Sequence, residues 1–175
     1  EQICQCIDLH KESKVSDPLL ISKEQVKDTD WKILNVFTQG LGNVGKGPDG
    51  VRLRPKEDGI TMPDGRDVFI HACRYMIHAL NSSLKQADLT IDDIAHFICH
   101  QANKRIIDSI RNFLGVDEER VPHNVERYGN ISSAALPALL DELNRGGKLQ
   151  KGDKLVFSAF GAGFTTGACV IEWAK

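Results

Sequence analysis

Three short stretches of this sequence carry groups that can stabilise negative charge on a reacting oxygen. His100 follows the apolar run AHFIC, Asn130 follows Gly129 in RYGN, and the stretch FGAGF spans Phe160 to Phe164. An imidazole N–H, a carboxamide N–H and backbone N–H groups left accessible by glycine can all donate hydrogen bonds to a developing oxyanion or enolate. Judged by residue type alone, His100 and Asn130 are equally suited to helix capping or to turns.

A metal site is the other chemistry that the residues around His100 suggest. His96, Cys99 and His100 lie within five residues. On a strand, His96 and His100 share a face about 13 Å apart, and Cys99 points the other way, so the three cannot hold one tetrahedral zinc. On a helix the two histidines could chelate, but no third ligand follows at a suitable spacing. The sequence disfavours zinc and predicts no cofactor.

The elements expected to position these residues alternate between strands and helices. Strands are predicted at 31–39, at 95–100 and as a pair within 153–173, and helices over about 20 residues after Asp64, at 103–114 before Gly115, and from 131 to the glycines at 146 and 147. We expect 40–55 to be a loop and 119–130 to be extended with a turn at Gly129. The alternation predicts an α/β fold, a mixed sheet covered by helices. Ligands of such sheets bind beyond the carboxyl ends of strands, where we place the three stretches.

The composition bounds the function classes. The chain has 175 residues, 41% of them hydrophobic, and a net charge of −2, which suits one globular domain and gives no electrostatic argument for nucleic acid or an acidic membrane. No apolar run approaches the roughly 20 residues that span a bilayer, and the N-terminus lacks a signal-peptide core, so we expect a cytoplasmic protein. The odd, scattered cysteines favour a reducing compartment. They are Cys4, Cys6, Cys73, Cys99 and Cys169.

Three motifs together resemble a known family. HQANKRI (His100 to Ile106), RYGNISSAALPALL (Arg127 to Leu140) and FGAGFTTGACVIEW (Phe160 to Trp173) resemble, in order and spacing, the C-terminal half of β-ketoacyl-ACP synthase III, a thiolase-fold condensing enzyme. The resemblance covers residues 31–175, which we assign as a C-terminal domain, and leaves 1–30 as a poorly matched N-terminal segment. Chalcone-synthase-like and hydroxymethylglutaryl-CoA synthase-like enzymes share the roles of the histidine and the asparagine, but the HQAN motif matches them less well.

The resemblance implies an acyltransferase of fatty acid or polyketide-type biosynthesis. A nucleophilic cysteine takes an acyl group from a CoA thioester and condenses it with a malonyl thioester on acyl carrier protein, with decarboxylation. His100 and Asn130 match the catalytic histidine and asparagine. The resemblance also implies a pantetheine entrance, a docking site for phosphate or acidic carrier protein at the mouth, and an acyl pocket. By the resemblance, the pantetheine entrance is lined by Ala102 and Asn103, and the mouth by Arg105 with Lys104. The acyl pocket is bordered by Gly161, Gly163 and Phe164.

The chain departs from the family in length and in its cysteines. A full member is about twice as long, and none of the five cysteines here lies in the family's nucleophile context. We therefore expect a C-terminal fragment, a separate domain or one subunit of a split enzyme, inactive alone and completed by a half or subunit that carries the cysteine. The resemblance further implies a dimer. Two alternatives stay open: a non-catalytic partner subunit or binding module of a thiolase-fold complex, and acyl transfer to a hydroxyl or amine.

Overall fold

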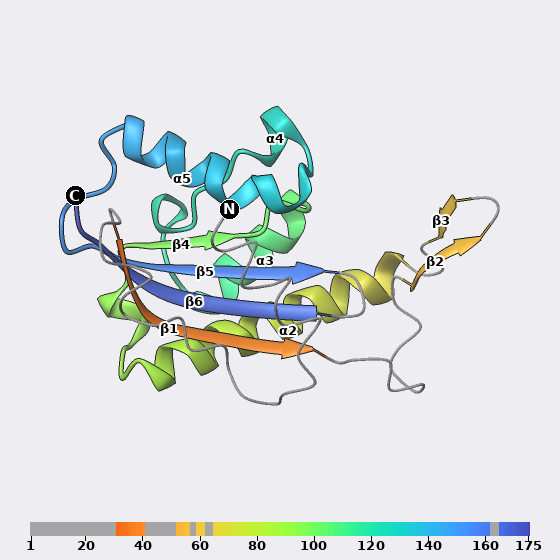
Figure 1. The fold of residues 1–175 in the computed structure, drawn as a ribbon, viewed down its shortest axis with the longest axis horizontal. Helices are drawn as coiled ribbons and strands as arrows, with labels where there is room; N and C mark the ends of the chain where they lie inside the picture. Colours follow the sequence, from red (N-terminus) through yellow and green to blue (C-terminus); the bar gives the residue numbers. More distant parts are fainter. Residues whose placement is uncertain (1–30, 41–51, 57–58, 62–64, 162–164) are drawn as a thin grey trace.

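The computed structural model describes residues 31–40, 52–56, 59–61, 65–161 and 165–175. Its centre is a four-stranded mixed sheet in the order β1-β6-β5-β4 (Figure 1). Strand β4 is parallel to β5, whereas β5 pairs antiparallel with β6 and β6 with β1. The strands are β1 (Trp31–Gly40), β4 (His96–Cys99), β5 (Lys154–Gly161) and β6 (Thr165–Trp173). The predicted mixed sheet is confirmed.

Helices cover both faces of this sheet (Figure 1). The α-helices are α2 (Gly65–Gln86), α3 (Lys104–Leu114), α4 (Val125–Tyr128) and α5 (Ala135–Arg145). Single 3₁₀ turns are η2 (Ile91–Asp93), η3 (Glu118–Arg120) and η4 (Ser132–Ala134). None of the helices in these described ranges combines the length and the apolar character needed to cross a membrane.

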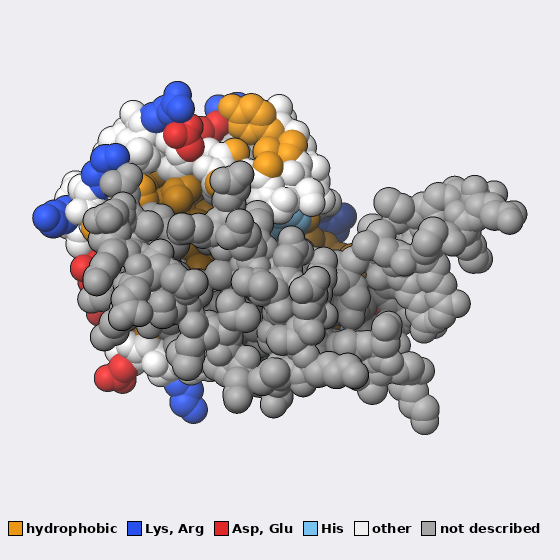
Figure 2. All heavy atoms as spheres, viewed as in Figure 1, with side chains coloured by type: hydrophobic (Ala, Val, Ile, Leu, Met, Phe, Trp, Pro, Cys, Tyr) orange, Lys and Arg blue, Asp and Glu red, His pale blue; other side chains and the backbone are white. Residues whose placement is uncertain are grey.

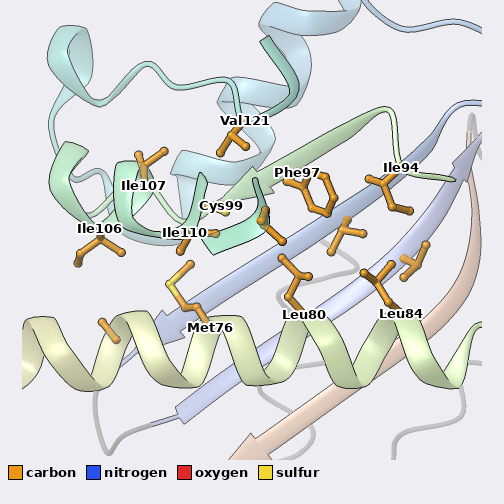
Figure 3. Packing of buried hydrophobic residues seen from close by; sticks show 14 residues of the cluster. Met76, Leu80, Leu84, Ile94, Phe97, Cys99, Ile106, Ile107, Ile110 and Val121 are labelled. Carbon is orange, nitrogen blue, oxygen red and sulfur yellow. The ribbon is translucent and has the colours of Figure 1, made fainter. Parts of the chain in front are cut away.

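The core beneath α2 and α3 explains why these helices form where they do. Apolar residues at spacings of three and four on α2, such as Met76, Leu80 and Leu84, are buried against the sheet (Figure 3). Ile106, Ile107 and Ile110 of α3 enter the same cluster, together with Phe97 and Cys99 of β4 (Figure 3). The strand end before His100 is therefore fixed by side chains from two helices.

The opposite face packs on α5. Because side chains alternate along a strand, Ile98 faces away from Phe97 and joins Leu139 and Leu143 of α5 in a second buried cluster. Pro137 lies at the third residue of α5, within its first turn, where the missing N–H costs no intrahelical hydrogen bond. The helix ends at Gly146, as the sequence predicts.

Two expectations about connecting segments are wrong. The segment 119–130 is not extended: it contains the end of η3 and the whole of α4, although the chain does turn at Gly129 with φ +67°. The expected loop 40–55 ends in a strand, because β2 (Arg52–Lys56) pairs with β3 (Gly59–Thr61) as a separate two-stranded sheet. A two-stranded sheet tolerates Pro55, since one side of each strand has no hydrogen-bonding neighbour.

Candidate active site

His100 lies where the sequence places it, directly after β4 at the carboxyl end of the parallel strand pair. Cys99 pairs with Ser158, and the His100 backbone N–H donates to the Ser158 carbonyl over 2.8 Å. Strand β5 ends three residues after Ser158, at Gly161, so His100 and Gly161 lie at the same end of the sheet. This is the end at which open α/β sheets bind ligands.

The His100 ring is partly buried. Burial lowers the pKa of this imidazole below its ordinary value, because a charged ring loses solvation there. None of the described residues hydrogen-bonds a His100 ring nitrogen, unlike His96, whose two ring nitrogens lie 3.1 Å and 3.2 Å from the backbone oxygens of Glu119 and Lys148. A neutral ring of this kind can donate one N–H to a bound oxygen.

Asn130 follows a different kind of element than expected. It follows helix α4 rather than a strand, so the predicted strand-end junction is wrong, and the side chain is exposed. Its Oδ1 accepts the Ser132 backbone N–H over 3.0 Å. A backbone N–H can only donate, so this bond identifies Oδ1 as the acceptor and turns the Nδ2 donors away from the turn. Ser132 itself has a φ of +58°, an uncommon conformation for a residue with a side chain.

Gln101 connects strand β4, which precedes His100, with helix α4, which precedes Asn130. This side chain is fully buried, its Nε2 donates to the Cys99 carbonyl over 2.8 Å, and its Oε1 accepts the Asn124 backbone N–H over 3.0 Å. Asn124 immediately precedes α4. The sequence prediction missed this role, and its only signal was an amide residue next to a strand end. Figure 1 shows α4 at the end of the sheet toward which β4 and β5 point.

A second connection attaches α4 to α5 through Glu142. The Glu142 carboxylate accepts from Asn124 Nδ2 over 3.3 Å and pairs with the Arg127 guanidinium. The pKa of Glu142 is lowered despite partial desolvation, because Tyr128, Asn124 and Arg127 all hydrogen-bond to it. Helix α4 is thus held at its start by Gln101 and along its side by α5.

The predicted substrate-binding residues at the start of α3 are only partly available. Asn103 caps α3, since its Oδ1 accepts the Arg105 N–H over 2.9 Å, and Ala102 packs against the core. Lys104 is occupied by ion pairs to Asp108 at 2.7 Å and Glu118 at 3.7 Å. Arg105 is exposed, and its guanidinium lies 5.5 Å from the centre of the Phe69 ring with no described carboxylate paired to it.

The glycine-rich stretch lies between two paired strands, as the sequence predicts. Gly161 is the last residue of β5 and β6 resumes at Thr165, so the two strands are consecutive and antiparallel. Gly163 and Phe164 lie outside the described residues. Gly161 is therefore the one predicted pocket residue whose place at this sheet end is observed.

Cys99 and Cys73 are poor nucleophiles, because burial raises the pKa of both thiols. Cys99 is fully buried in β4, and burial raises the pKa of its thiol to about 12. Burial also raises the pKa of Cys73 in the middle of α2. Cys169 lies partly buried in β6, and Cys4 and Cys6 fall outside the described residues. Within the described ranges, no three His, Cys, Asp or Glu side chains are grouped to hold a metal ion.

Comparison with known proteins gives one consistent answer. The family model for "3-Oxoacyl-[acyl-carrier-protein (ACP)] synthase III C terminal" matches residues 84–173, just over half of the chain. β-Ketoacyl-ACP synthase III of Staphylococcus saprophyticus is 38% identical over 140 residues, which are 80% of this chain and 44% of that protein. The Clostridium novyi synthase III is 43% identical over 110 residues, 63% of this chain and 34% of its own length.

Solved structures agree with the sequence relatives. The synthase III of Aquifex aeolicus matches with a TM-score of 0.75 at 29% identity, covering 83% of this chain and 46% of its own. The Thermus thermophilus synthase III matches with a TM-score of 0.72 at 36% identity, covering 84% and 48%. The chain thus spans about half the length of the proteins that it matches.

The mixed sheet, its helical layers and these structural matches define one half of a thiolase-like fold. Within that class, the chain belongs to the family of β-ketoacyl-ACP synthase III C-terminal domains. Membership is carried by the stretch that contains His100, Asn130 and Gly161, and the resemblance stated from the three motifs is confirmed.

Proposed function

We propose that this chain is the C-terminal half of a β-ketoacyl-ACP synthase III-like acyltransferase, which condenses an acyl thioester with a malonyl thioester. The observation that carries the proposal is His100: a ring with a lowered pKa, engaged by no described residue, at the ligand-binding end of the sheet. The relatives that share this domain are named as synthases of this type.

The chemistry assigned to the two side chains is stabilisation of an enolate. In the proposed step the bond between the malonyl α-carbon and its carboxylate breaks, CO₂ leaves, and the electron pair moves onto the thioester oxygen. A neutral His100 N–H and an Asn130 Nδ2–H donate to that oxygen. The α-carbon then attacks the acyl group on a cysteine, whose thiolate leaves. A neutral imidazole suits this task because it donates without transferring a proton.

The nucleophile in this proposal comes from outside the described residues. Neither Cys99 nor Cys73 has a thiol that ionises readily, and the chain spans less than half of each curated relative cited above. We assign the cysteine to an N-terminal half or partner subunit that covers the exposed site. Tyr128 and Ile131 are large exposed apolar residues on either side of Asn130 (Figure 2 shows hydrophobic surface over the α4 region), which favours such a cover.

Acyl carrier protein and CoA thioesters are the proposed partners. Arg105 is the better of the two predicted cations at the start of α3, because its charge has no described carboxylate partner, whereas Lys104 is already paired. A guanidinium binds phosphate through two parallel hydrogen bonds. We therefore assign Arg105 to the pantetheine phosphate or to an acidic patch on the carrier.

The test separates acyl loading from decarboxylation in the assembled enzyme, in which this chain is joined to a cysteine-bearing N-terminal half. His100→Ala and Asn130→Ala should each lower malonyl-ACP decarboxylation by about 10²- to 10³-fold, as removal of one oxyanion donor does, and spare acyl loading from acyl-CoA. Arg105→Ala is the matched control and should raise KM for the carrier with little change in kcat. Unchanged decarboxylation in both variants would reject the roles of His100 and Asn130.

The isolated chain gives an independent check. Without the cysteine-bearing half it should take no acyl group from radiolabelled acyl-CoA, and acyl transfer to any of its residues would contradict the assignment of the nucleophile. Tight carrier binding by an assembled protein that never decarboxylates malonyl-ACP would favour the binding module instead. A product formed on a hydroxyl or amine acceptor would favour the other alternative.

A further inference from the structure

Helix α4 is too short to hold its own position. It has four residues, and the backbone hydrogen bonds that close it are those of Arg127, Tyr128 and Gly129, between 2.7 Å and 3.2 Å long. Isolated helices of this length are not stable in water, because nucleation costs more than a single turn returns. The placement of Asn130, two residues after α4, therefore depends on what ties α4 to its neighbours.

His123 provides a further tie to α4, separate from the one that α5 makes. Its Nδ1 lies 2.9 Å from Glu126 Oε2 in the first turn of α4, and its Nε2 lies 3.1 Å from Glu118 Oε1 in η3. The ring is mostly buried, with 20% of its side chain exposed. His123 thus bridges the 3₁₀ turn that follows α3 and the helix that leads to Asn130.

This bridge can be complete only when the ring is charged. A carboxylate only accepts hydrogen bonds, and a neutral imidazole has one N–H, so one of its two nitrogens would present a lone pair to a carboxylate. The imidazolium donates from both nitrogens and adds charge attraction to each bond. The two-carboxylate geometry around His123 therefore fits the protonated ring.

The charged groups around His123 come from every element packed against it. Glu118 belongs to η3 and Glu126 to α4, while α3 contributes Asp108, Lys104 and Arg111. The bond to His123 lowers the pKa of Glu118, and the pKa of Glu126 is lowered first by its own backbone N–H and then by His123, so both carboxylates stay charged in mild acid. The two α3 cations are paired with Asp108 and Glu118, which leaves Glu126 to His123.

We propose that His123, as the imidazolium, is a positioning residue for Asn130, and that loss of its proton loosens α4 as pH rises. The other described ties to α4, from Gln101 and Glu142, involve groups that do not change charge near neutral pH. Histidine does change charge there. The catalytic meaning of this tie rests on the proposed function, whereas the tie itself is a property of this chain.

The contact between His123 and α4 can be tested without measuring catalysis. NMR on the isotope-labelled chain follows the His123 ring nitrogens and the exchange protection of the Tyr128 and Gly129 amides from pH 5 to 8, corrected for intrinsic exchange. We expect the imidazolium signature at the acid end and a two- to fivefold fall in protection toward pH 8, about what a partly exposed ion pair contributes. The Gly115 amide, which ends α3 through the Arg111 carbonyl, is the internal reference and should not change.

Variants make the inference falsifiable. His123→Gln keeps a polar side chain of similar length without charge and should remove the pH dependence at Tyr128 and Gly129. Glu126→Gln should remove it too, and it changes a side chain that is 48% exposed, so we expect this second variant to fold. His78→Gln, at an exposed position on α2, should leave the dependence intact. A neutral His123 ring at pH 5, or the same pH dependence in the His123 and Glu126 variants, would overturn the proposal.

Failure of the His123 proposal and failure of the proposed function give different results. In the assembled enzyme, malonyl-ACP decarboxylation should fall on the basic side of its pH profile by a similar two- to fivefold, and the His123→Gln profile should lose this limb. A tie that is present by NMR in an enzyme that does not decarboxylate would reject the proposed function and leave the structural inference standing.

Discussion

At the scale of single residues, the site depends on which groups stay uncharged. His100 is kept neutral by burial, which disfavours its imidazolium form, whereas both ring nitrogens of His123 lie within hydrogen-bonding distance of carboxylates. The same side chain therefore meets a different environment at each of the two positions. Environment, and not residue type, assigns the two tasks.

The neutrality of His100 has a consequence for stability. A histidine in the unfolded chain binds a proton near pH 6.5, but folded His100 binds it only at a lower pH, so the unfolded state takes up the proton first as pH falls. His100 thus costs no stability above that range and lowers the free energy of unfolding below it. Urea denaturation at pH 7.5, 6.5 and 5.5 should show a steeper loss for the parent chain than for His100→Asn. Parallel pH dependences would contradict the burial of this ring.

At the scale of elements, α3 is defined by signals at both of its ends. Asn103 caps its start through the Arg105 N–H, and Gly115 ends it with φ +66° and a hydrogen bond from its N–H to the Arg111 carbonyl. The start of α3 follows His100 by only four residues. A change in where α3 begins would therefore move both the exposed Arg105 and the corner that carries His100.

The end of α3 offers a clean measure of backbone conformation. A Cβ built on Gly115 meets no atom within 4 Å, so substitution there costs conformational energy and not a clash. Gly115→Ala should lower the free energy of unfolding by about 1 kcal/mol, because residues with a Cβ disfavour the left-handed region. Gly115→Asn should cost less, since asparagine tolerates this conformation. Equal stability of the Ala variant and the parent chain in urea titrations would show that α3 does not end as described.

At the scale of the whole molecule, the sheet is held between two separate buried clusters. One lies beneath α2 and α3, the other beneath α5, and β4 contributes to both through alternate side chains. The site lies at the end of the sheet where β4 and β5 stop and where α3 begins after β4. Its rigidity comes from packing on both sides of β4.

Core packing on α3 should govern global stability. Ile110 is fully buried in the first cluster, whereas Phe113, one turn away on the same helix, is 55% exposed. Ile110→Ala should cost about 3 kcal/mol through lost burial and a cavity, and Phe113→Ala should change stability by about 0.5 kcal/mol or less. The comparison uses midpoints and slopes of urea denaturation. Similar losses in the two variants would contradict the position of α3 in the structure.

The sequence by itself determined the elements whose signals are local. Spacings of three and four fix the buried face of α2, Asn103 and Gly115 bound α3, and the apolar run before His100 makes β4. The three motifs were enough to assign the family and to select His100 and Asn130 as candidates. In each case the signal is a short pattern of residues that are close in the chain.

Only the tertiary structure decided how Asn130 is held. Helix α4 was expected to be extended because four residues carry no readable periodicity, and its ties to Gln101 and Glu142 join residues 23 and 18 positions apart. The lowered pKa of His100 likewise arises from packing around the strand end. Short-range patterns locate donors along a chain, but burial and long-range hydrogen bonds determine which of them are neutral, oriented and brought to the same end of the sheet.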